Sequence, residues 1–247
     1  MRRKVFTLLT ALLLPTGAFA LDETAGTRVN LYLGAGAINP EDGSSDSGPS
    51  LGIRLEQFRP GLKIGGSIDA KGIYTGSGDG HSGGYGQIAL YRALFGDAPD
   101  GLFVGFAFGY IGYEWQDRKF YVNGKESKAD WGGVTGAFAA PAVRLNAFNN
   151  SLSIRAQYYL FTHGEQKLQY KFYSFGDTYI TPSADFKGFS IDVSASRNFG
   201  NKFLGLNVNY TNVEFDDANE TVKQDKIHLD SVRVSSWSIG ITAGVRF

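Results

Sequence analysis

Trp237-Ser-Ile-Gly-Ile-Thr-Ala-Gly-Val-Arg-Phe247 ends the chain, and in these eleven residues apolar side chains alternate with small or polar ones. Successive side chains of a strand point to opposite faces, so all the apolar residues share one face. Ten residue steps of about 3.3 Å, tilted by roughly 40°, rise about 25 Å, which is the height of the apolar band on a membrane barrel. The pattern predicts a membrane-spanning strand with Trp237 and Phe247 in the two interfacial aromatic layers.

This ending resembles the closing strand of bacterial outer-membrane β-barrel proteins. The resemblance implies a location in the outer membrane, with membrane lipid and lipopolysaccharide as partners. It also implies a terminal insertion signal that the barrel-assembly machinery recognises, formed by Trp237, Ile239, Ile241, Val245 and Phe247. The motif is common to the whole class, so it indicates no particular member.

The first residues have the pattern of a secretory signal peptide. Arg2-Arg3-Lys4 is a basic segment, Val5 to Leu14 is apolar, and Ala18-Phe19-Ala20 is a small-x-small cleavage site. The apolar stretch is shorter than the about 20 residues that a transmembrane helix needs. We therefore expect residues 1–20 to be removed after export by the general secretory route, which leaves 21–247 as one barrel domain.

Composition excludes several classes of protein. Removal of the signal leaves 24 − 3 = 21 Lys and Arg against 24 Asp and Glu, so there is no basic footprint for nucleic acid. The absence of cysteine excludes disulfides and a lipid-attached N-terminus. No apolar run outside the signal is long enough for a spanning helix, and a closed barrel is the remaining way to cross a membrane. We expect no cofactor.

The rest of the chain divides into an all-β, up-and-down antiparallel barrel of ten strands, with eight or twelve as alternatives. Long polar connections alternate with short ones, as extracellular loops and periplasmic turns do. The faces of the strand at 85–95 cannot be assigned, and the pattern over 131–146 predicts a change of inward parity near Pro141, which indicates a bulge. The predicted strands begin near 28, 50, 62, 85, 102, 131, 152, 188, 203 and 237.

Two hairpins are expected to protrude beyond the bilayer. Asn123-Gly124 between Phe120-Tyr-Val122 and the following residues is a strong type I′ turn signal. The aromatic segment 163–185 forms the second hairpin, with its tip near Phe175-Gly-Asp177. The segment 216–230 is predicted as a charged loop. Candidate surface-binding residues on the aromatic hairpin are Tyr170, Phe172, Tyr173, Phe175 and Tyr179. Arg118-Lys119, Lys125 and Lys128 are candidates for contact with lipopolysaccharide phosphates.

Charged residues at inward positions predict an ion-pair network in the lumen. A barrel of this size has an interior that side chains fill, so a wide porin is not expected. A mixed-sign set survives burial when its members pair. The alternative is a selectivity path for a small polar solute. The predicted members are Arg54, Glu56, Lys63, Asp69, Lys71, Arg155 and Asp192.

Chemistry at the outer rim is the remaining question. His81, His163 and His228 each have carboxylates nearby in the sequence, and a His–acid pair can activate water. The chain lacks the His-x-Ser pattern of lipid A deacylases. Its acidic loops have no EF-hand spacing. We assign no catalytic and no metal residues, and predict a structural or adhesin-like surface role. A narrow pore or small-solute transporter is the first alternative, and a surface hydrolase is the second.

Overall fold

A computed structural model describes residues 26–59, 62–75, 80–96, 100–172, 176–222 and 224–247. The predicted signal peptide, 1–20, lies outside the described residues. No helix in the described ranges is long and apolar enough to cross a membrane. The strands of these ranges are β1 (Gly26–Pro40), β2 (Asp46–Arg59), β3 (Ile64–Tyr74), β4 (Ser82–Phe95), β5 (Gly101–Val122), β6 (Lys125–Ala147), β7 (Leu152–Tyr159), β8 (Phe161–Phe172), β9 (Gly176–Ile180), β10 (Phe186–Phe199), β11 (Lys202–Phe215), β12 (Ala218–Val222), β13 (Asp225–Leu229) and β14 (Val232–Arg246).

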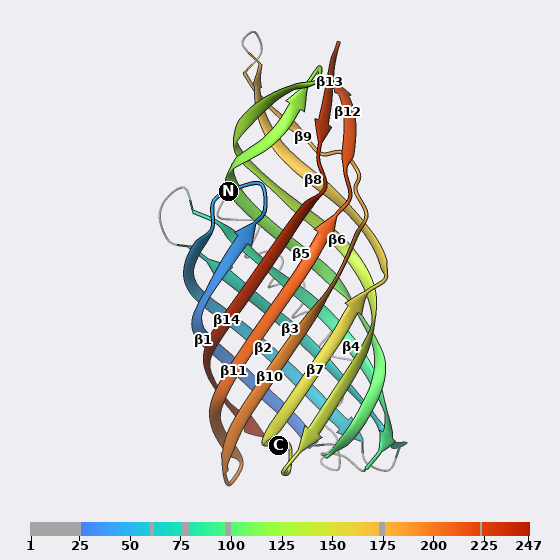
Figure 1. The fold of residues 1–247 in the computed structure, drawn as a ribbon. Coiled ribbons are helices and arrows are strands. Elements are labelled where there is room, and N and C mark those ends of the chain that lie inside the picture. Colours follow the sequence, from blue (N-terminus) through green and yellow to red (C-terminus); the bar gives the residue numbers. More distant parts are fainter. Residues whose placement is uncertain (1–25, 60–61, 76–79, 97–99, 173–175, 223) are drawn as a thin grey trace.

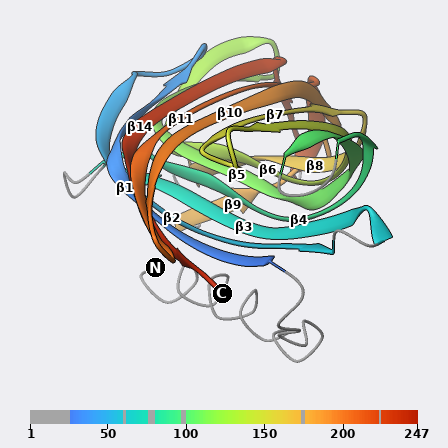
Figure 2. The same ribbon diagram turned by 90° about the horizontal axis from the view of Figure 1, so that it is seen from below.

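The described strands form one closed antiparallel barrel of ten strands with a smaller extension at one end (Figure 1). The barrel order is β5-β4-β3-β2-β1-β14-β11-β10-β7-β6, and pairing of β5 with β6 closes the ring. Seen along the axis, these strands encircle the interior (Figure 2). The prediction of ten strands is confirmed, against eight or twelve. The seam lies between β1 and β14, which pair from Arg28↔Arg246 to Pro40↔Val234.

The two ends of the barrel differ in the way that an outer-membrane barrel requires. At one end β1 begins beside the end of β14, where the Phe247 amide donates to the Thr27 carbonyl at 2.9 Å. The connections at this end are short, and Asn149, Asn150 and Gly200 adopt positive φ in them. At the other end the strands run on into hairpins. The first connection is shorter than predicted, because β1 and β2 leave only residues 41–45 between them.

Side chains alternate between a filled interior and an apolar outer wall. Leu33, Ile241 and Leu206 project outward and are more than half exposed in the isolated chain, as lipid-facing residues are. Trp237, the sixth residue of β14, and Phe247, which follows its last residue, are also exposed. On β4, the strand whose faces could not be assigned, the buried residues from Tyr85 onward are Tyr85, Gly86, Gln87, Ala89 and Tyr91, whereas Ile88 and Leu90 are exposed.

The irregularity predicted on β6 at Pro141 lies instead on the neighbouring strand. β6 buries its even-numbered residues without interruption from Gly132 to Asn146, so its parity does not change there. The partner changes: Ala142 pairs with Gln157, but Ala139 pairs with Phe161, which gives the β7–β8 side one extra residue. Pro141 has no N–H to donate to a ladder. The extra residue separates β7 from β8 and reverses the inward parity between them.

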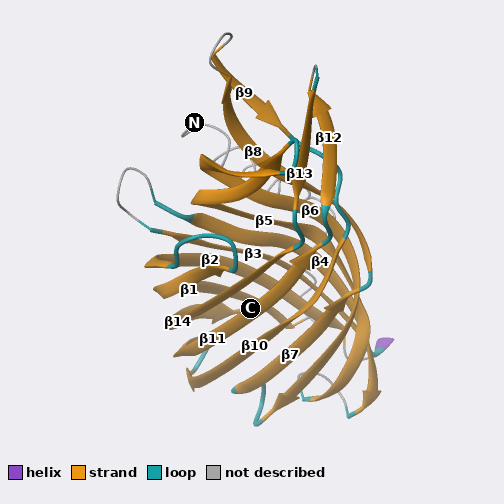
Figure 3. Ribbon diagram, turned by 45° about the horizontal axis from the view of Figure 1, so that its top comes forward, coloured by secondary structure: helices purple, strands orange, loops and turns teal. Residues whose placement is uncertain are grey.

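The extension is a folded structure with its own apolar core. β8 pairs with the upper part of β6 and with β9, and β13 pairs with β12 and with the tip of β5 (Figure 3). The prediction of an irregular charged loop over 216–230 is wrong, because the segment forms the β12–β13 hairpin. Its alternate residues Ala218, Ile227 and Leu229 are buried. We call this extension the cap. Its apolar core consists of Phe120, Ala129, Leu168, Ile180, Ile227 and Leu229.

Candidate functional site

The lumen is the most distinctive chemical environment of the barrel, and Asp69 lies at its centre. Asp69 comes from β3 and is 1% exposed. Its Oδ2 is 3.1 Å from the Arg54 guanidinium and also accepts a hydrogen bond from Arg155, on the far side of the barrel. Arg54 extends this bridge to Asp192 at 2.9 Å. Ions from β2, β3, β7 and β10 are thereby joined across the lumen.

A second group of buried charges lies beside the first. Glu56 accepts from Arg144 at 2.8 Å, and its carboxylate is 3.9 Å from Arg54, so the two groups are continuous. Arg28 donates to the Asn150 carbonyl at 2.6 Å, and its guanidinium lies 3.7 Å from the centre of the Phe203 ring. Aromatic faces and carbonyls thus supplement the carboxylates as partners of the buried cations.

Six of the seven predicted network residues lie in the lumen. Lys71 joins through Asn207, which accepts from its ammonium at 2.7 Å and donates to Asp192 at 3.0 Å. Lys63 was placed wrongly: it is exposed, has φ of 53° and precedes the first residue of β3. The prediction had extended the alternation of β3 one step too far into the turn.

Sequence reasoning missed Arg28 and Arg144, both buried in the lumen. The parity error near Pro141 concealed Arg144, although Arg144 and Asn146 keep the even parity of β6. Arg28 shares its parity with Asn30 and Tyr32 on β1 and could have been found from that pattern. The corrected network holds five cations against three anions. The members are Arg28, Arg54, Lys71, Arg144, Arg155, Glu56, Asp69 and Asp192.

An aromatic layer closes the lumen above these charges. Phe186 stacks on Phe215 with ring centres 4.6 Å apart, and Phe138 meets Tyr159 edge to face at 4.7 Å. Trp115 is buried in the same cluster. Within the charged layer, the cavity bounded by Arg28, Glu56 and Arg144 measures about 10 Å³, which is room for a single water molecule. The described side chains of this layer are therefore closely packed around these three residues.

A buried polar contact separates the aromatic layer from the cap. Arg118 of β5 donates to the Gly133 carbonyl and to Gln166, and lies 3.4 Å from Asp42. Burial lowers the pKa of Arg118 to about 10, and the Asp42 carboxylate opposes that shift. Burial also raises the pKa of Asp42. Arg118 is fully buried, so its predicted contact with lipopolysaccharide phosphates is wrong. Lys119, Lys125 and Lys128 are exposed on the same hairpin.

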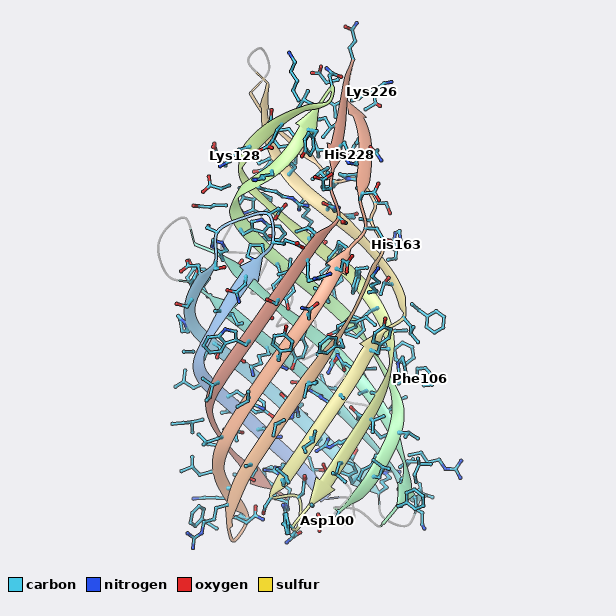
Figure 4. The ribbon with its side chains drawn as sticks, in the orientation of Figure 1. Asp100, Phe106, Lys128, His163, Lys226 and His228 are labelled. Carbon is cyan, nitrogen blue, oxygen red and sulfur yellow. The ribbon has the colours of Figure 1, made fainter. Side chains whose placement is uncertain are left out.

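The three histidines occupy three separate places. His81 is buried beneath the first connection, where its Nε2 contacts the Ser44 carbonyl oxygen. His163 lies on the outer wall, 3.7 Å from Asp185. His228 is on β13 in the extension, 3.0 Å from Asp230 (Figure 4). Over the described ranges, no three His, Asp or Glu side chains are arranged to hold a metal ion.

The aromatic hairpin is formed by β8 and β9, as predicted. Tyr179 is 53% exposed, and its ring meets Trp131 edge to face with centres 6.3 Å apart. Tyr170 and Phe172 belong to β8. Tyr173 and Phe175, at the predicted tip, lie outside the described residues.

No protein-family model and no curated protein sequence matches the chain. Among solved structures, the outer membrane protease OmpT from Escherichia coli matches over 90% of this chain and 96% of its own, with a TM-score of 0.51 and 6% identity. The toluene transporter TodX from Pseudomonas putida covers 96% of this chain and 93% of its own, with a TM-score of 0.33 and 8% identity. Neisserial surface protein A covers 91% and 97%, with a TM-score of 0.28 and 12% identity.

At such identities the likeness concerns the fold alone. A closed ten-stranded ring with an apolar outer wall and a charged interior agrees with it. The chain has the fold of the bacterial outer-membrane β-barrels, with an ion-pair network buried in its lumen.

Proposed function

We propose that this barrel is a sealed membrane anchor that displays a folded platform at the cell surface, in a structural or adhesin-like role. The observation that carries the proposal is the continuous filling of the interior: ion pairs, then stacked aromatic rings, then the Arg118 contact, then the apolar cap. A barrel that conducts solute keeps an open path through such layers. A barrel that presents a surface benefits from rigid support beneath it.

The length of the strands supports display. β5 has 22 residues and β6 has 23. At about 3.3 Å per residue and a tilt of roughly 40°, a strand of that length rises about 55 Å, against an apolar band of about 25 Å. More than half of the hairpin therefore stands outside the hydrocarbon region. At this level the exposed side chains carry both signs of charge and include Lys125, Glu126, Lys128, Tyr179 and Lys226.

Export and assembly complete the proposal. The chain reaches the outer membrane by the general secretory route after loss of residues 1–20, and the assembly machinery recognises its closing strand. The outward face of the closing strand supports this, because Trp237, Ile239, Ile241 and Phe247 are exposed in the folded chain. Lipopolysaccharide phosphates meet the exposed Lys119, Lys125 and Lys128.

The sealed lumen is tested by electrical recording from the purified chain in planar bilayers. We expect no steady conductance, and a stable open level in the nanosiemens range would overturn the sealed anchor in favour of the pore. The hydrolase alternative has a separate test. Peptidase and lipid-hydrolase assays on the refolded chain are expected to show no activity that depends on His163 and His228.

The display role is tested on whole cells. Escherichia coli producing the full chain is measured for adherence to cultured epithelial monolayers, with a variant in which Lys119, Lys125 and Lys128 are replaced by Ser. The matched control replaces Arg59, Lys63 and Lys202, exposed cations outside the extension. Adherence lost only in the first variant supports the proposal. The proposal is contradicted if cells producing the unmodified chain adhere no better than cells without the protein.

A further inference from the structure

The barrel wall is interrupted between β8 and β10. The ladder between β7 and β10 ends at the pair Tyr159↔Gly188, where the extra residue sends β8 away from β10. The two sides rejoin higher up, where the Ala184 amide donates to the Gly164 carbonyl at 2.9 Å. Between these points Phe186 has no backbone partner on β8. The Thr162 hydroxyl takes that place, accepting from the Phe186 N–H at 3.0 Å and donating to its carbonyl.

A groove of about 670 Å³ occupies this interruption on the outside of the barrel. Its volume is within the range of small-molecule sites in proteins, about 300–1,000 Å³. The lining is mostly apolar and includes Ala137 and Ala139 of β6 together with Leu160 and Phe161. Leu160 and Phe161 are more than half exposed, so the groove has an apolar lip open to its surroundings.

The groove lies where the lipid-facing surface ends. Below it the outward residues are apolar, namely Tyr158 on β7 and Phe189 and Ile191 on β10, and Phe108 on β5 lies beside Ala139. At its rim the outward residues become polar, with His163, Asp185 and Lys187 lining it. The groove is therefore continuous with the membrane-contacting wall, and its rim is at the level of lipid headgroups.

The charged rim is weakly paired. His163 lies 3.7 Å from Asp185, and the Lys187 ammonium lies 3.8 Å from Glu214, with more than half of the Lys187 side chain exposed. Exposed pairs at such distances contribute little. An ammonium has three donors, so Lys187 keeps hydrogen-bonding capacity for a further acceptor.

We propose that the groove holds one acyl chain of an outer-leaflet lipid, with the phosphate of that lipid at Lys187. This rests on the proposed function, because the ligand is the membrane in which the anchor resides. The apolar lining takes the hydrocarbon, and the break in the ladder supplies the room that a regular wall lacks. Thr162 prevents the break from leaving unpaired backbone groups at the membrane boundary.

The test uses the full chain in phosphatidylcholine vesicles that contain brominated phosphatidylglycerol, whose acyl chains quench a nearby fluorophore. The chain has no cysteine, so one introduced thiol can be labelled alone. The Ala139→Cys variant places a bimane in the groove. The matched Phe108→Cys variant places it on the direct cross-strand neighbour, outside the groove and facing lipid.

We expect half-maximal quenching of the Ala139→Cys label at a mole fraction of brominated lipid about tenfold below that of the Phe108→Cys label. Adding Ala137→Phe fills the groove, and the quenching curves of the two labels should then coincide. The control Val143→Phe, on the lipid face of the same strand, should leave the two quenching curves separate. Lys187→Gln reduces the preference for brominated phosphatidylglycerol over brominated phosphatidylcholine, and Lys202→Gln does not.

Coincident quenching curves for the two labels in the unfilled variants would overturn the groove proposal while leaving the sealed anchor intact. Failure of the anchor has a different signature. In that case neither label is quenched at any mole fraction, because the chain does not enter the vesicles, and both proposals are overturned.

Discussion

Thr162 supplies, through one hydroxyl group, both hydrogen bonds that a neighbouring strand would give to Phe186. The two residues lie on β8 and β10, at the level where these strands are not paired along their backbones. A side chain therefore closes the wall where the ladder is interrupted. This relationship makes the interruption compatible with a membrane boundary, where an unpaired backbone group is costly.

Replacing Thr162 with Val removes both bonds at nearly constant volume. We expect the free energy of unfolding to fall by about 1–3 kcal/mol, because the Phe186 N–H and C=O lose their partner. Urea titration of the chain in vesicles measures the change, and hydrogen exchange at the Phe186 amide locates it. Thr162→Ser keeps the hydroxyl and serves as the control. Equal stability and equal exchange in the Val and Ser variants would refute the role of the hydroxyl.

Asp69→Ala leaves Arg54 and Arg155 without their shared acceptor inside the lumen. Removing one partner of a buried ion pair typically costs about 3–5 kcal/mol, and we expect a loss of that order. The midpoint of denaturant unfolding, followed by tryptophan fluorescence, is the measurement. Asp217→Ala, at an exposed position, is expected to change the midpoint little. A midpoint for Asp69→Ala equal to that control would show that the network contributes nothing to stability.

Asp42 lies in the first connection and Asp46 directly follows it, and their pKa values are shifted in opposite directions. Burial raises the pKa of Asp42, against the opposing effect of Arg118. A hydrogen bond from Thr75 and one from the Ser47 amide lower the pKa of Asp46. Because Asp42 binds its proton more readily in the folded chain, stability increases as the pH falls through the interval between its folded pKa and 3.8. The contribution of Asp46 is present above pH 3.8 and is lost below it.

Carboxyl NMR titration of the chain labelled at aspartate measures both groups. We expect the Asp42 resonance to move at a pH above that of Asp46. The Asp42→Asn and Asp46→Asn variants assign the two signals. Simultaneous titration, or the reverse order, would contradict the burial of Asp42 beside Arg118.

The cap should loosen separately from the barrel. Leu168 is fully buried in the cap core, and Leu168→Ala is expected to cost about 2–5 kcal/mol in the local stability of the extension. Limited trypsin digestion should then cleave faster at the exposed Lys125 and Lys128. The barrel itself should stay folded, so that an unheated sample still migrates as the folded protein on a detergent gel. Leu206→Ala, on the lipid face, is the control, and the same cleavage rate in both variants would argue against a folded cap.

The alternation of β10 and β14 was predictable because each has one face against lipid and one against the lumen. Asp192 and Ile191, or Ser238 and Ile239, fall on opposite faces in the sequence as in the structure. The same reasoning failed for β4, whose two faces could not be assigned from the sequence. Its inward residues include Ala89 and Tyr91, which pack in the apolar core of the barrel, so both faces are apolar at that level. A period of two cannot be read where the two environments are alike.

Other features depend on contacts distant in the sequence. The β12–β13 hairpin is rich in charge, and its few apolar residues gain a core because residues of β5, β6, β8 and β9, such as Phe120 and Leu168, pack with them. The groove arises from a single extra residue between β7 and β8. Pro141 signals that irregularity, but the proline is on β6 and cannot show which of the two paired strands deviates.

The ladders of the wall also have unequal lengths, which bears on how the molecule resists mechanical load. The seam joins β1 to β14 from Arg28 to Pro40, whereas β7 is paired with β6 only from Ala142↔Gln157 to Ala147↔Leu152. A pulling force shared among adjacent ladders breaks the one with the fewest rungs first. The line of rupture under tension therefore lies beside the groove, and the joint between the first and last strands outlasts it.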